Sequence, residues 1–141
     1  MRHILIILAL ISSTNLSAQD DKVYNIVSEP ARLMMCEAHP MSNADKKKCS
    51  EQSLLKYITQ KITYPEAGIA DSIEGSVVVR FVVKKNGLVG DAKLLKDIGG
   101  GCGEAAMAVI DSIRADSVLW RPGVLDSAFV DSYTTIPVRF R

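Results

Sequence analysis

Aromatic residues and net charge are both scarce in this chain of 141 residues. A single Trp is present, the aromatic residues together make up 6% of the chain, and the formal net charge at pH 7 is +1. A surface for stacking bases is therefore not expected, and no broad positive field is available to hold nucleic acid or an anionic membrane. We expect no nucleic-acid partner.

Histidine is nearly absent, which removes the commonest catalytic base. Only His3 and His39 occur, and the first lies in the expected N-terminal leader, just before its apolar run. A pairing of Cys102 with His39 has no third group that would orient it, and no serine triad is suggested by spacing. Two pairs of carboxylates are more typical of solvated turns or strand ends than of an acid–base pair: Asp91 with Asp97, and Asp126 with Asp131. We predict that the protein is not an enzyme and has no cofactor and no small-molecule substrate.

Long hydrophobic runs are also lacking. The run Ile4 to Ile11 follows the basic Arg2, and polar residues follow it. A helix that spans a bilayer needs about 20 apolar residues, so this run fits the core of a signal peptide instead. We predict a signal peptide over residues 1–18, cleaved after Ala18, and a soluble mature protein in the periplasm. The alternative is an uncleaved or buried N-terminal helix. An N-terminal extension over residues 19–45 and a domain over residues 46–141 would follow.

Cysteine occurs three times, an odd number for an oxidising compartment. Cys36 and Cys49 are close in sequence and flank a loop-like stretch. We favour a disulfide between them, which would stabilise the fold by about 3 kcal/mol. A metal site formed by Cys36, His39 and Cys49 is the alternative, but it lacks a fourth ligand and a CxxC pair. Cys102 would remain unpaired, and a redox role for it stays open.

Two strands and a tight turn form the clearest pattern in the chain. Residues 76–83 are rich in β-branched side chains and predict a strand. Asn86-Gly87 is a strong hairpin signal, so a second, antiparallel strand should run from about residue 88 to residue 96. A final strand is expected over about residues 132–141. Because Pro137 lacks an N–H group, that strand should lie at a sheet edge or carry a bulge.

Helices are predicted on both sides of the hairpin. Ser42 or Asp45 would cap a helix that ends near Lys61, and Pro65 would begin a short helix that stops near Asp71. Another helix is expected over about residues 104–115, after a glycine cluster that lacks the Lys-Ser/Thr of a phosphate loop. The sequence therefore predicts an α+β fold, with a small antiparallel sheet of about three strands and helices packed on one face.

Several motifs in order carry a resemblance to a known family. They are Tyr64-Pro65-Glu66-Ala67, Gly75 to Val83, Asn86-Gly87, the loop Ile98 to Gly103 with Glu104-Ala105-Ala106, Trp120-Arg121-Pro122-Gly123, and Ile136 to Phe140. Over residues 64–141 the chain resembles the C-terminal domain of the TonB energy-transducer family. A cysteine pair before the first helix, like Cys36 and Cys49, also recurs in versions from Bacteroidetes-type bacteria.

The resemblance implies a mode of action. Domains of this family reach across the periplasm and grip an extended segment of an outer-membrane transporter, which adds a strand to the sheet. The final strand would be the receiving edge here. The expected partner-binding residues are Tyr133, Thr135, Pro137, Arg139 and Arg141.

Two features differ from a full transducer of that family. The leader looks cleavable, and five prolines are too few for a long proline-rich spacer. We therefore expect a free domain that binds transporter segments as an accessory or a competitor. The alternative is a structural or interaction protein of the envelope, either a homodimer or peptidoglycan-associated, that uses the same surface.

Overall fold

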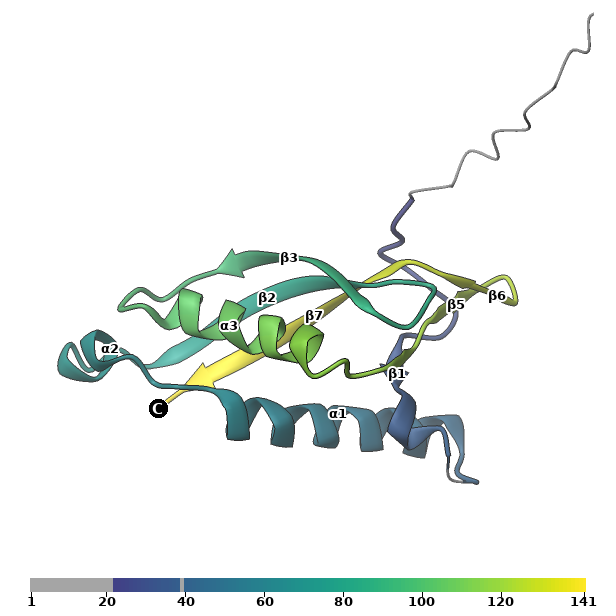
Figure 1. The fold of residues 1–141 in the computed structure, drawn as a ribbon, viewed down its shortest axis with the longest axis horizontal. Coiled ribbons are helices and arrows are strands. Elements are labelled where there is room, and N and C mark those ends of the chain that lie inside the picture. Colours follow the sequence, from purple (N-terminus) through teal and green to yellow (C-terminus); the bar gives the residue numbers. More distant parts are fainter. Residues whose placement is uncertain (1–21, 39) are drawn as a thin grey trace, which may run out of the picture.

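A three-stranded antiparallel sheet forms the centre of the protein (Figure 1). The computed structural model describes residues 22–38 and 40–141. The strands lie in the order β3-β2-β7, so β2 is central and β7 is at an edge. The predicted α+β fold, with its small antiparallel sheet and packed helices, is confirmed. The predicted signal peptide over residues 1–18 and His39 fall outside the described residues.

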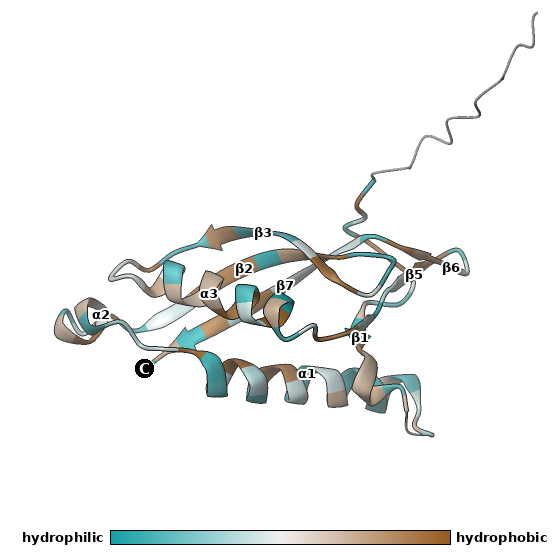
Figure 2. Cartoon of the chain, viewed as in Figure 1, coloured by the Kyte–Doolittle hydropathy of each residue, from teal (hydrophilic) through white to brown (hydrophobic). Residues whose placement is uncertain are grey.

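The central strand β2, Gly75–Val83, follows from its richness in β-branched residues. Val77, Val79, Phe81 and Val83 are fully buried on the face toward the helices. β2 pairs with β3, Val89–Lys96, across the predicted turn, where Gly87 has a φ of 84°. On its other side, β2 pairs with β7, Ser132–Phe140, in an unbroken register from Gly75 opposite Phe140 to Val83 opposite Ser132. Figure 2 shows β2 as a mostly hydrophobic strand, whereas β3 and β7 carry both hydrophobic and polar residues.

Three helices accompany the sheet. Helix α1, Asn43–Lys61, begins at Ser42, whose side chain accepts a hydrogen bond from the Asp45 backbone N–H, as predicted. The short α2, Glu66–Ala70, follows Pro65. Helix α3, Cys102–Ala115, begins two residues earlier than expected, after Gly101 in a left-handed conformation with φ of 81°. Its buried stripe, which includes Val109, Ile110 and Ile113, packs against the sheet.

Trp120 closes one end of the core. It is 1% exposed, and its ring meets that of Phe81 edge-on at a centroid distance of 5.6 Å. Tyr64 meets Phe140 in the same manner at 5.4 Å near the other end of β2. Trp120 therefore packs on the sheet, in contact with β2.

Short pairings tie residues 24–33 to the C-terminal half of the chain. β1, Arg32–Leu33, pairs with β4, Trp120–Arg121, and leads into a 3₁₀ turn, Met34–Cys36. Farther upstream, Tyr24 bridges to Ser132, and Glu29 bridges to Val124. Two further strands, β5 (Gly123–Leu125) and β6 (Ala128–Val130), form a hairpin that the sequence analysis did not predict.

The cysteines pair as the sequence analysis favoured. Cys36 and Cys49 form a disulfide that joins the 3₁₀ turn to α1. The two sulfurs are therefore not thiolate ligands, and within residues 22–38 and 40–141 no cluster of three or more metal-ligating side chains occurs. Cys102 is free and fully buried, and its burial raises the pKa of the thiol. This environment makes Cys102 a packing residue rather than a reactive thiol.

Among the described helices, none combines the length and the apolar character that crossing a bilayer requires.

Candidate peptide-binding edge

The outer side of β7 carries the backbone groups that the sheet leaves free. The N–H of Tyr133 donates to the carbonyl of Tyr24 at 3.0 Å, so it points away from β2. In an antiparallel pair, residues alternate between those that bond to the neighbouring strand and those that face outward. Thr135, Pro137 and Arg139 therefore share the outward phase of Tyr133, whereas Thr134, Ile136 and Val138 bond to β2.

Pro137 stands at an outward-facing position of β7, where the lack of an N–H removes no hydrogen bond to β2. Its missing N–H would have faced outward, so the register of β2 with β7 continues past it without a bulge. The sequence predicted that the strand of Pro137 would lie at a sheet edge or carry a bulge, and in the structure it lies at an edge. At this position the rim offers an acceptor and no donor.

The segment around Tyr24 covers only the start of this rim. Tyr24 donates its N–H to the carbonyl of Asp131 and accepts from Tyr133. Within residues 22–38 and 40–141, no other backbone hydrogen bond reaches the outer side of β7. The free rim thus extends from Thr135 to Arg139.

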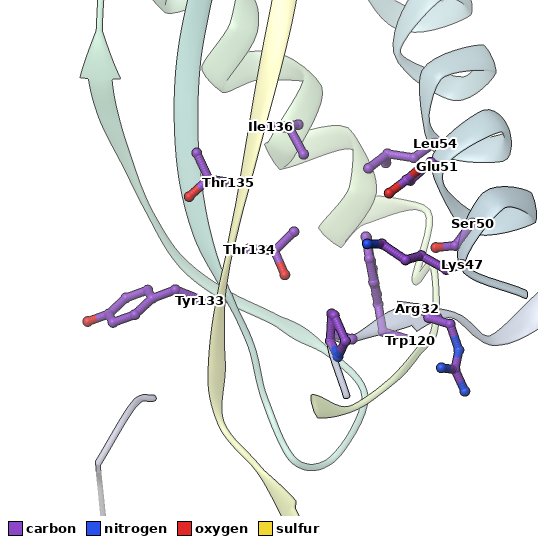
Figure 3. A pocket seen from close by; sticks show the side chains of 12 residues that line it. Arg32, Lys47, Ser50, Glu51, Leu54, Trp120, Tyr133, Thr134, Thr135 and Ile136 are labelled. Atoms are coloured by element: carbon purple, nitrogen blue, oxygen red, sulfur yellow. The ribbon is translucent and has the colours of Figure 1, made fainter. Parts of the chain in front are cut away.

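The structure places all five predicted partner-binding residues on or directly after β7. Thr135, Pro137, Arg139 and Arg141 are exposed, and Tyr133 is half-buried because the guanidinium of Arg80 lies 4.1 Å from the centre of its ring. Four of the five belong to β7 itself, and Arg141 follows its last residue. Figure 3 shows Tyr133 and Thr135 directed to the opposite side of the strand from Thr134 and Ile136.

A groove lies between this rim and helix α1, and sequence reasoning did not anticipate it. One cavity of about 280 Å³ lies at its end near Trp120, and a second of about 310 Å³ adjoins it. Leu54 and Glu51 project from α1 toward β7 and line both cavities (Figure 3). The second cavity is mainly apolar: its lining is Glu51, Leu54, Leu55, Ile58, Thr135, Ile136 and Pro137.

An ion-pair cluster fixes the start of α1 to the rest of the domain. Glu37 accepts from the buried Arg32 at 2.6 Å and also pairs with Lys46, on α1, at 3.4 Å. The hydrogen bond from Arg32 is the main reason that the pKa of Glu37 lies below its ordinary value. Together with the disulfide, this cluster holds the groove wall in place.

Basic side chains flank the free rim and the groove: Arg139 on β7, Arg141 directly after it and Lys47 on α1. Within the part of the chain that the structure describes, Arg139, Arg141 and Lys47 form no ion pair, and Glu51 is the one acidic residue lining the groove. Such an arrangement suits an extended segment that carries acidic residues and donates backbone hydrogen bonds.

Comparison with known proteins finds a matching family. The family model of the Gram-negative bacterial TonB protein C-terminal matches residues 60–141. The chain belongs to the TonB C-terminal family. Membership implies a role in TonB-dependent transport, and TonB C-terminal domains serve transport and interaction rather than catalysis. Proteins of the TonB family are associated with the periplasm and the cell envelope.

Two solution NMR structures of the Helicobacter pylori TonB C-terminal domain are similar to this chain. The first is 23% identical, with a TM-score of 0.47, and the match covers 64% of this chain and 90% of that one. The second, of a longer segment, is 22% identical, with a TM-score of 0.49, and covers 77% and 92%. No curated protein sequence matches the chain.

Proposed function

We propose that the protein is a periplasmic binding domain that grips an extended segment of an outer-membrane transporter by adding it as a fourth strand beside β7. The observation that carries this proposal is the free rim from Thr135 to Arg139, whose outward backbone groups have no partner within the described residues. An extended chain satisfies such groups with a ladder of its own backbone hydrogen bonds.

The geometry limits the length of the added strand. Tyr24 occupies the rim at Tyr133, so an incoming strand pairs from Thr135 onward. Pro137 contributes its carbonyl alone, and Thr135 and Arg139 each offer a donor and an acceptor. The proposed partner-binding residues are therefore those expected from the sequence, with Thr135 and Arg139 as the main backbone anchors and Arg141 as a charged flank.

The proposal includes export of the chain. We propose that residues 1–18 are a cleaved signal peptide, that residues 19–45 are an extension and that the domain proper begins near residue 46. The disulfide between Cys36 and Cys49 supports an oxidising compartment. N-terminal sequencing of the exported protein tests this part, with Gln19 as the expected first residue.

Titration with synthetic peptides tests strand addition. Peptides from the N-terminal segments of outer-membrane transporters are added to the isotope-labelled protein, and amide shifts are followed by NMR. The largest shifts are expected at Thr135 and Arg139. Shifts confined to the far edge of the sheet, at β3, would contradict the proposal.

A pair of proline variants provides the matched control. Thr135→Pro removes an outward N–H, so peptide binding should weaken while the pairing with β2 persists, as it does at Pro137. Thr134→Pro removes an N–H that bonds to β2, so it should lower the stability of the fold by about 1–3 kcal/mol. Unchanged peptide affinity in a folded Thr135→Pro variant would count against strand addition.

A further inference from the structure

Helix α1 lies almost entirely before the residues that the family model matches. It covers Asn43–Lys61, whereas the match begins at residue 60. It nevertheless forms the second wall of the groove along β7. A strand added at this edge would therefore meet a helix that contributes side-chain contacts of its own.

The pleat of the sheet determines which side chains would meet α1. Directly opposed residues of neighbouring strands point to the same face. A residue of the added strand opposite Ile136 would thus point into the groove, where Leu54, Leu55 and Ile58 lie. Ile58 is already buried, but Leu55 is 61% exposed, so an apolar side chain there would cover surface of Leu55 that α1 leaves open to solvent.

We propose that α1 is a selectivity wall: it accepts one apolar side chain of the strand that pairs with β7. This inference rests on the proposed function and specifies its partner. The occupant is a segment of another protein with an apolar residue opposite Ile136 and an acidic residue near Arg139.

The charge of the rim favours a different protein over a second copy of this chain. Arg139 and Arg141 are exposed and form no ion pair within the described residues. A second β7 would bring further arginines to the same rim, whereas an acidic flank would complement it.

Host peptides with one varied position test the wall. The probes are acetylated heptapeptide amides of sequence Glu-Thr-Thr-Xaa-Thr-Thr-Thr, with Leu or Ser at Xaa, titrated into the oxidised protein by NMR. The Leu peptide should bind the wild type about fivefold more tightly than the Ser peptide. In Leu55→Ser, which changes an exposed groove residue, this ratio should fall below about twofold.

Gln52→Ser is the matched control, because Gln52 is an exposed residue of α1 that does not line the groove. It should keep the wild-type ratio. Suppose that the amide signals of Thr135 and Arg139 shift with both peptides. The selectivity wall is then overturned, while strand addition stands, if the two peptides bind the wild type equally well or if the preference for Leu persists in Leu55→Ser. If neither peptide shifts these amides, nor any transporter peptide, strand addition fails and the wall fails with it.

Discussion

The backbone N–H of Tyr133 donates a 3.0 Å hydrogen bond to the carbonyl of Tyr24. This contact places a residue of the N-terminal extension on the outer side of β7, where it pairs in parallel with the start of the strand. The extension thereby covers the first position of an otherwise open rim.

Replacing Tyr24 by proline should open that first position. Tyr24→Pro removes the N–H that donates to Asp131, and the fixed φ of proline disturbs the bridge. Hydrogen exchange of the Tyr133 amide should become at least about tenfold faster, whereas Ile136, bonded to β2, should keep its protection. Ile26→Ser, which changes an exposed side chain two residues downstream, is the control that should leave Tyr133 unaffected. Equal acceleration in both variants would contradict the bridge.

Removal of the disulfide should destabilise the fold and loosen the start of α1. The double variant Cys36→Ser with Cys49→Ser should lose about 3 kcal/mol of unfolding free energy, because the bridge closes a loop with a sequence separation of 13. Denaturant unfolding measures this loss. A thiol count under denaturing, non-reducing conditions should find one free thiol in the wild type, that of Cys102. Three thiols would exclude the bridge.

Glu37 should give the protein part of its acid sensitivity. Its folded pKa lies below its ordinary value of 4.5, so its stabilising effect is complete above pH 4.5 and is lost as the pH falls through the folded pKa. Glu37→Gln should lower the unfolding free energy at pH 7 by about 1–3 kcal/mol, because the buried Arg32 loses its charged partner.

The same variant should show a shallower loss of stability as the pH falls below 4.5. Unfolding in denaturant at several pH values measures both effects. Asp111→Asn, which removes an exposed partner of Arg114, is the control and should change stability by about 0.5 kcal/mol or less. If the unfolding free energy of Glu37→Gln fell with pH as steeply as that of the wild type, Glu37 would not contribute to the acid sensitivity.

Two glycines with similar dihedral angles should respond differently to alanine. Gly87 has a φ of 84°, and an added Cβ would lie 2.7 Å from the backbone oxygen of Trp120. Gly99 has a φ of 81°, and a Cβ there would have nothing within 4 Å. Gly99→Ala should cost about 1–2 kcal/mol from backbone strain alone, and Gly87→Ala about 1–3 kcal/mol more. Thermal unfolding compares them, and equal costs would contradict the tight approach of the hairpin turn to Trp120.

Local patterns predicted most of the framework of this fold. The β-branched residues over 76–83, the Asn86-Gly87 turn and the Ser42 cap are local signals of a few neighbouring residues, and each appears in the structure as expected. Pro137 likewise predicted the edge position of its strand from the lack of a single N–H.

What could not be predicted depends on contacts between distant segments. The pairings of β1 with β4, and of Tyr24 with Ser132, involve one or two residues each and leave no periodic signal. The hairpin of β5 and β6 turns at Asp126 and Ser127, both with positive φ, where the stronger signal of a glycine is missing. The groove arises because α1 packs beside β7, and helical periodicity alone does not say which strand a helix will flank.

Pro137 also has a consequence for the behaviour of the protein at high concentration. Fibrils grow when sheet edges pair through their outward-facing backbone amides, and Pro137 removes one of these amides from the edge of β7. A peptide of a few residues can bind through the outward backbone groups on either side of Pro137, whereas a long repetitive stack would lack this hydrogen bond in every molecule. The position of Pro137 therefore permits the binding of a short peptide and disfavours the growth of fibrils.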